Sequence, residues 1–87
     1  MNVIFSTKAR DDVKFWTKHH PKIEGRIKVL IENIKKNPYS GIGKPESLKH
    51  ELSGLWSRRI DQQHRLIYSY DEKEGVLTIK SCKGHYS

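Results

Sequence analysis

The chain has 87 residues, of which 34% are hydrophobic, and it carries a formal net charge of +7. That length supports one domain, residues 1–87, around one modest core, and the charge favours a polyanionic partner such as nucleic acid or an acidic protein segment. The single cysteine excludes an internal disulfide, the histidines lack metal-ligand spacing, and no apolar run suits a signal peptide or a membrane span. We therefore expect a cytoplasmic protein that uses no metal and no other cofactor.

The first half of the chain predicts one strand and two helices. Residues 2–6 are apolar and β-favouring, and Ser6 or Thr7 is suited to cap the helix that follows. Along that helix, hydrophobic side chains recur at helical spacing at Ala9, Val13 and Trp16. Its charged side chains are expected to face outward: Lys8, Asp11, Asp12 and Lys14.

A second helix is predicted between Pro21, which fits a first helical turn, and the Asn-Pro pair at 37–38, which ends it. Its apolar stripe is the clearest periodic signal in the sequence and consists of Ile23, Ile27, Leu30, Ile31 and Ile34. Because these positions share one helical face, we expect them to be buried against a sheet.

The second half predicts a loop followed by strands. Residues 38–47 contain two prolines and two glycines, have no periodicity, and carry Glu46. The expected strands are residues 48–52, 56–61, 64–70 and 76–82, with Gln-Gln as a poor turn between the second and third of them. This order predicts an α+β fold with two N-terminal helices packed on one face of an antiparallel sheet, which leaves the other face free to be polar.

Segment 44–65 concentrates Lys and Arg on predicted strands opposite an acid in the loop. Metal-free RNA cleavage needs a base for the 2′-hydroxyl proton, a cation for the charge on the phosphorane, and an acid for the leaving 5′-oxygen. Glu46 suits the base, Arg65 the cation, and His85 the acid, because imidazole titrates near neutral pH. Further candidates for RNA or phosphate contacts are Lys49, Arg58, Arg59 and Tyr86.

Each of these residues also has a plain structural interpretation. The strand arginines commonly pair with sheet-surface acids such as Asp61, and a terminal His-Tyr pair is often frayed. His50 and His64 are interpreted as structural, and both tryptophans as packing residues.

The string GKPESLKHELSGLWSRRIDQQHRLIY, residues 43–68, closely resembles the signature of the Txe/YoeB toxins in the RelE/ParE superfamily of bacterial toxin–antitoxin systems. The resemblance extends to the Asp-Asp pair at 11–12, Trp16, the Asn-Pro pair at 37–38 and the His-Tyr pair at 85–86. One departure is Gly84, which stands where the family has a bulkier residue.

The resemblance implies a RelE-like, microbial-ribonuclease-like fold and a ribosome-dependent mRNA interferase that cuts codons in the ribosomal A site and inhibits translation. It implies that Glu46 acts as base, Arg65 as phosphate ligand and His85 as acid. The residues it implies as assistants are Lys49, Arg59 and Tyr86. The implied partners are a cognate YefM/Axe-type antitoxin, the ribosome with its mRNA, operator DNA reached through the antitoxin complex, and a second copy of the toxin.

Two other functions remain open at this stage. The same superfamily fold serves ParE-like toxins that poison DNA gyrase without acting as nucleases, although the acid–Arg–His set argues against this function here. A basic sheet is also compatible with a non-catalytic module that only binds RNA or protein.

Overall fold

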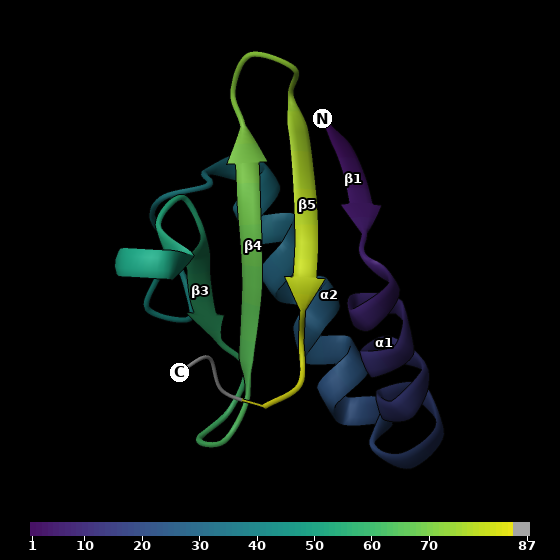
Figure 1. Ribbon diagram of the computed structural model, residues 1–87. Helices are drawn as coiled ribbons and strands as arrows, with labels where there is room; N and C mark the ends of the chain where they lie inside the picture. The colour runs from purple at the N-terminus through teal and green to yellow at the C-terminus, as the bar shows by residue number, and fades with distance from the viewer. Residues whose placement is uncertain (85–87) are drawn as a thin grey trace.

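The computed structural model describes residues 1–84, which form a five-stranded sheet with two helices on one of its faces (Figure 1). Figure 1 is viewed onto the opposite, open face, so that α2 lies behind the sheet. The elements in chain order are β1 (Asn2–Phe5), α1 (Thr7–His19), α2 (Pro21–Lys36), β2 (Glu46–Ser47), the 3₁₀ turn η1 (His50–Leu52), β3 (Trp56–Arg59), β4 (Arg65–Asp71) and β5 (Val76–Ser81).

The sheet has the strand order β1-β5-β4-β3-β2, and three of its four pairings are antiparallel. The prediction of an α+β fold with both helices on one face is confirmed, but β1 pairs with β5 in parallel, so the sheet is not wholly antiparallel. After β1 the chain forms both helices, enters the opposite edge of the sheet at β2 and then adds β3, β4 and β5 in turn toward β1. The last strand therefore runs alongside the first in the same direction.

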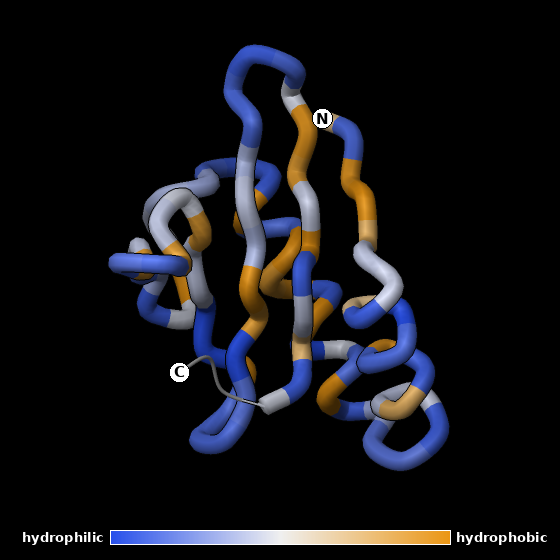
Figure 2. Tube along the Cα trace, viewed as in Figure 1, coloured by the Kyte–Doolittle hydropathy of each residue, from blue (hydrophilic) through white to orange (hydrophobic). Residues whose placement is uncertain are grey.

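Local sequence signals account for both helices. The Ser6 side chain accepts a hydrogen bond from the Ala9 amide (3.0 Å) and caps α1, whereas Pro21 occupies the first turn of α2. The apolar stripe of α2 is confirmed, since Ile27, Leu30 and Ile34 are buried. Hydrophobic stretches follow β1, β5 and α2, while the tip of the β4–β5 hairpin is hydrophilic (Figure 2).

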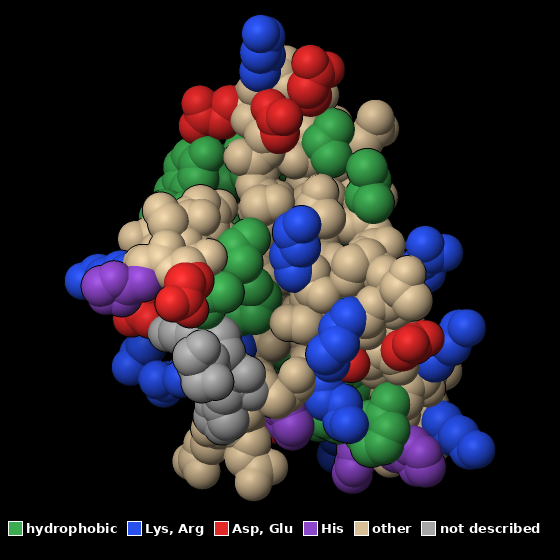
Figure 3. All heavy atoms as spheres, viewed as in Figure 1, with side chains coloured by type: hydrophobic (Ala, Val, Ile, Leu, Met, Phe, Trp, Pro, Cys, Tyr) green, Lys and Arg blue, Asp and Glu red, His purple; other side chains and the backbone are tan. Residues whose placement is uncertain are grey.

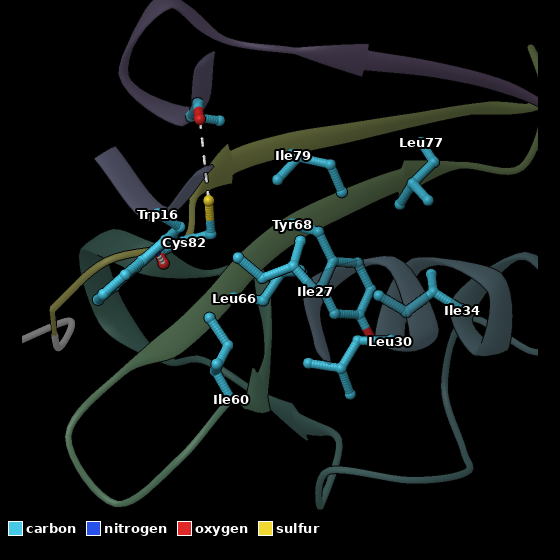
Figure 4. Packing of buried hydrophobic residues seen from close by; sticks show 11 residues of the cluster. Trp16, Ile27, Leu30, Ile34, Ile60, Leu66, Tyr68, Leu77, Ile79 and Cys82 are labelled. Carbon is cyan, nitrogen blue, oxygen red and sulfur yellow. Dashed lines mark hydrogen bonds between the residues drawn. The ribbon is translucent and has the colours of Figure 1, made fainter. Parts of the chain in front are cut away.

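The core lies between α2 and the inner face of the sheet. Leu30 and Ile34 pack there with Tyr68 of β4 and with Leu77 and Ile79 of β5 (Figure 4). Trp16 and Cys82 extend the same cluster beneath α1. Burial on this face means that alternate strand residues must point to the open face.

The loop and turn boundaries differ from the sequence-based expectations. Glu46 begins the short strand β2 instead of lying in the preceding loop, and the expected strand at 48–52 is replaced by η1, whose first residue, His50, has φ of 57°. The turn between β3 and β4 is wider than a Gln-Gln hairpin. The Asp61 carboxylate organises it by accepting the amides of Gln63 and His64, each at 2.8 Å.

Asp12, expected to face outward, is 5% exposed, and that expectation was wrong. Its carboxylate accepts the Cys82 amide at 2.9 Å and pairs with the Lys8 ammonium at 2.7 Å. The Trp16 indole donates to the Cys82 carbonyl at 2.8 Å. Because β5 ends at Ser81, these two side chains provide partners for backbone groups just beyond the strand. Helix α1 therefore anchors the chain as it leaves the sheet.

Arg58 is 0% exposed and belongs to the scaffold. Its guanidinium donates to the Tyr68 hydroxyl (3.1 Å) and the Asn33 side chain (2.6 Å). It also donates to three backbone carbonyls of the loop between α2 and β2, those of Ile42 (3.0 Å), Asn37 (2.8 Å) and Ser40 (3.0 Å). These five bonds use all five guanidinium donors. The expectation that Arg58 binds RNA phosphate is therefore corrected.

Replacing Arg58 should destabilise the protein strongly. Arg58→Met removes the donor from the buried Tyr68 hydroxyl, the Asn33 side chain and three loop carbonyls, and we expect the free energy of unfolding to fall by about 3 kcal/mol in chemical denaturation. For Arg58→Lys we expect a comparable fall in the free energy of unfolding, because an ammonium lacks the planar five-donor fork of a guanidinium. Arg10→Met on the exposed side of α1 is the matched control and should change stability by less than about 0.5 kcal/mol. Equal effects at both positions would contradict this role.

The thiol of Cys82 should be unreactive in the folded protein. Burial, and secondly the nearby Asp12 carboxylate, raises its pKa from 9.0 to about 12. At mildly alkaline pH this lowers the thiolate fraction by about 1000-fold. A disulfide reagent should therefore modify Cys82 very slowly in the native protein and rapidly in concentrated guanidinium chloride. The absorbance of the released thiol follows the reaction. Rapid labelling of the native protein would show that this region opens readily.

Candidate active site on the open face of the sheet

The strand register brings three of the predicted site residues onto the open face. Glu46 pairs with Ser57 across β2 and β3, and Arg59, two residues beyond Ser57, pairs with Arg65 across β3 and β4. Because side chains alternate along a strand, Glu46 and both arginines share the face opposite the buried Arg58. Strand spacings place the Cα atoms of Glu46 and Arg65 about 12 Å apart, a span that their long side chains can bridge around one phosphate group.

The two arginines form a cationic pair. Arg59 is exposed and Arg65 is half-buried. A long hydrogen bond of 3.5 Å joins the Arg65 guanidinium to the Asp61 carbonyl, and within residues 1–84 neither arginine forms an ion pair with a carboxylate. Two like charges directly opposite each other destabilise a sheet. A bound anion would relieve this repulsion, since guanidinium groups present a fork that matches phosphate.

A hollow of about 680 Å³ is lined by residues 46–52, the segment that begins with the predicted base. Glu46 and Lys49 both line it, so Lys49 is placed with the predicted base. His50 lines it too, although the sequence analysis treated it as structural. On the same side of the molecule, acidic side chains gather at the tip of the β4–β5 hairpin, while Lys and Arg side chains are spread over the rest (Figure 3). The hairpin tip is the Asp71–Glu74 segment, which begins at the opposite end of β4 from Arg65.

The predicted acid His85 and the assisting Tyr86 lie outside the described residues, so their roles stay predictions. The described chain ends beside the arginine pair, because the Gly84 carbonyl accepts a hydrogen bond from the Arg65 amide at 3.0 Å. The structure therefore brings Glu46, Arg59 and Arg65 to one face, sets Lys49 in the same hollow as Glu46, and removes Arg58 from this face.

Sequence reasoning overlooked a contact of His64, which it interpreted as structural without assigning a partner. The Nδ1 atom of His64 accepts the Gly84 amide at 2.8 Å, and its ring packs against Trp16 with 4.7 Å between centroids. The only signal in the sequence is that His64 directly precedes Arg65. The partner is 20 residues away along the chain and is found only in the folded structure.

Residues 1–84 contain no group of three or more His, Cys, Asp or Glu side chains arranged to hold a metal ion. Neither of the described helices is long and apolar enough to cross a membrane.

The two-helix, five-strand fold with a cationic open face defines a small α+β toxin of the RelE/ParE superfamily. The model of the YoeB-like toxins of bacterial type II toxin–antitoxin systems matches residues 5–86. The chain belongs to the YoeB family of these toxins.

Individual relatives agree over almost their full length. The chain is 42% identical to toxin YoeB of Escherichia coli K12 over 86 residues, covering 99% of this chain and 100% of the relative. It is 46% identical to toxin RelK of Mycobacterium tuberculosis H37Rv, covering 98% of each chain. A structure of a YoeB/ParE toxin from Agrobacterium tumefaciens superposes with a TM-score of 0.96 at 36% identity, covering 99% of this chain and 100% of that one.

Solved relatives also occur in assemblies. YoeB of Staphylococcus aureus is found in a heterotetrameric YoeB–YefM toxin–antitoxin complex, and this chain matches it with a TM-score of 0.89 at 41% identity over 99% of this chain and 98% of that one. A YoeB dimer from the same organism matches with a TM-score of 0.90 at 41% identity and the same coverage.

Removing one charge of the arginine pair should stabilise the free protein. We expect Arg59→Gln to raise the free energy of unfolding by about 0.2–1 kcal/mol at low salt, because it relieves the repulsion with Arg65. The gain should shrink as salt is added and screens the pair. Lys73→Gln is the matched control, since Lys73 lies between Glu72 and Glu74 and its loss should bring no gain. A less stable Arg59→Gln protein would contradict the proposed repulsion.

Proposed function

We propose that this toxin is a ribosome-dependent mRNA interferase that cleaves mRNA in the ribosomal A site and so inhibits translation. The observation that carries the proposal is the strand register, which sets a carboxylate and two arginines on one open face. A carboxylate base beside a phosphate-binding pair of cations provides two of the three groups that metal-free RNA cleavage needs. Membership of the YoeB family supports the same function.

In the proposed reaction Glu46 removes the proton from the 2′-hydroxyl, whose oxygen then attacks the adjacent phosphorus. The P–O5′ bond breaks, giving a 2′,3′-cyclic phosphate and a 5′-hydroxyl. Arg65 and Arg59 hold the phosphate and meet the negative charge that grows on its oxygens. His85 gives the leaving 5′-oxygen its proton. Lys49 adds charge from the hollow, and Tyr86 stacks on a base or donates to a phosphate oxygen.

In this proposal the dependence on the ribosome follows from the exposure of Glu46 and Arg59. The arginines and Glu46 lie on the surface of a sheet. The protein alone therefore does little to fix how an RNA strand lies across them. Catalysis requires the 2′-oxygen, the phosphorus and the leaving oxygen in line. A ribosome that holds the codon in a fixed shape provides this alignment, and free RNA should be cleaved slowly.

For partners, we propose a cognate antitoxin of the YefM/Axe type with an acidic segment that covers the cationic face. The charge of +7 on this chain supports such a partner. Operator DNA would be reached through that complex, and a toxin homodimer is a further expected assembly. The S. aureus relatives that occur as a YoeB–YefM complex and as a YoeB dimer support both proposals.

The test is cleavage of mRNA on programmed ribosomes by variants of the proposed base and cation. Glu46→Gln and Arg65→Ala should each lower the cleavage rate by about 100-fold or more while ribosome binding is largely kept. Glu32→Gln and Lys28→Ala on α2 are charge-matched controls and should cleave normally.

Three outcomes would overturn the proposal. Cleavage that survives both substitutions would remove the assigned roles. Intact messages combined with altered DNA supercoiling would identify a gyrase poison. Tight RNA or ribosome binding without any cleavage by the wild type would identify a binding module.

A further inference from the structure

The backbone beyond β5 is fixed by side chains from distant parts of the chain. Cys82 is bonded to Asp12 and Trp16 of α1, and the Lys83 ammonium lies 4.2 Å from the centre of the Phe15 ring. The backbone of Gly84 forms two further hydrogen bonds, to the consecutive residues His64 and Arg65. Its amide donates to Nδ1 of His64 at 2.8 Å, and its carbonyl accepts from the Arg65 amide at 3.0 Å.

This double contact specifies both the chemical state of His64 and the residue type at 84. An Nδ1 atom that accepts a hydrogen bond carries a lone pair, so the imidazole is neutral with its proton on Nε2. Gly84 has φ of 86°, a left-handed backbone conformation that glycine adopts without a steric cost. Glycine is thus the residue type that this bonded conformation favours at position 84.

The ring of His64 is held from its other side as well. It packs edge-on against the buried Trp16, with an interplanar angle of 74°, and the indole of Trp16 donates to the Cys82 carbonyl. Cys82, Gly84 and His64 are therefore joined through one indole ring and one imidazole ring. Movement of the His64 ring would release the amide of Gly84 next to Arg65.

We propose that His64 is a positioning residue that holds the backbone of Gly84 against Arg65 and so steadies Arg65 in the site. This inference rests on the proposed function, since Arg65 is the residue that the proposed reaction uses to bind the phosphate. A displacement of about 1 Å in a reacting group can cost about 100-fold in rate. Loss of one hydrogen bond outside the reacting atoms can therefore lower turnover sharply.

The test compares two variants of His64 in the full-length protein. His64→Leu keeps an apolar side chain against Trp16 but removes the acceptor. His64→Asn places an amide oxygen close to the position of Nδ1 and should restore the bond to Gly84. The first readout is hydrogen exchange of the Gly84 amide by NMR, which should accelerate about tenfold or more in the Leu variant and recover in the Asn variant.

The second readout is mRNA cleavage on ribosomes, with kcat and KM separated. In His64→Leu we expect kcat to fall by about 10-fold to 100-fold with KM unchanged, and in His64→Asn to recover most of the loss. In the wild type, imidazole nitrogen shifts should show the proton of His64 on Nε2. Denaturation curves for all three proteins separate this effect from a general loss of folding.

The outcomes distinguish the two proposals. Faster Gly84 exchange with unchanged kcat would overturn the positioning role and leave the interferase function intact. Unchanged Gly84 exchange in a folded Leu variant would overturn the anchor itself. A wild type that cleaves no ribosome-bound mRNA would overturn the proposed function and with it the catalytic part of the inference, while the exchange data would still decide whether His64 holds Gly84.

Discussion

The buried guanidinium of Arg58 is the interaction on which the arrangement of this protein depends. Within residues 1–84 it has no carboxylate partner and is solvated instead by five hydrogen bonds to hydroxyl, amide and backbone oxygens. Burying a charge is costly unless every donor is satisfied, and here the acceptors come from α2, from β4 and from the loop that leads into β2. The loop is therefore held in place by the same residue that anchors β3.

This constraint reaches the candidate site through strand alternation. With Arg58 directed into the core, its neighbour Arg59 must face the open side, where the register sets it opposite Arg65. The loop that Arg58 holds delivers Glu46 to the start of β2 on that same side. One inward arginine thus determines the relative placement of the carboxylate and the outward cations, and it leaves an unfavourable like-charge pair that a bound anion would relieve.

A second set of contacts ties the end of the described chain to the site. Asp12 and Trp16 of α1 hold Cys82, and His64 holds Gly84 beside Arg65. Helix α1 therefore has two tasks, since it covers part of the core and also fixes backbone that has left the sheet. Its buried carboxylate makes sense as a hydrogen-bond acceptor for that backbone, and the burial of Cys82 follows from the same packing.

The sequence alone predicted the features that depend on residue types at fixed short spacings. These are the cap at Ser6, the apolar stripe on α2, the α+β order of elements and the family resemblance. The sequence also singled out Glu46, Arg59 and Arg65, but it offered no way to tell inward Arg58 from outward Arg59, because alternation gives two faces without saying which is covered. Burial of Asp12, the parallel β1–β5 pair and the bond from Gly84 to His64 were decided only by tertiary structure. Each joins groups distant along the chain, and such contacts exist only after packing has chosen which elements meet.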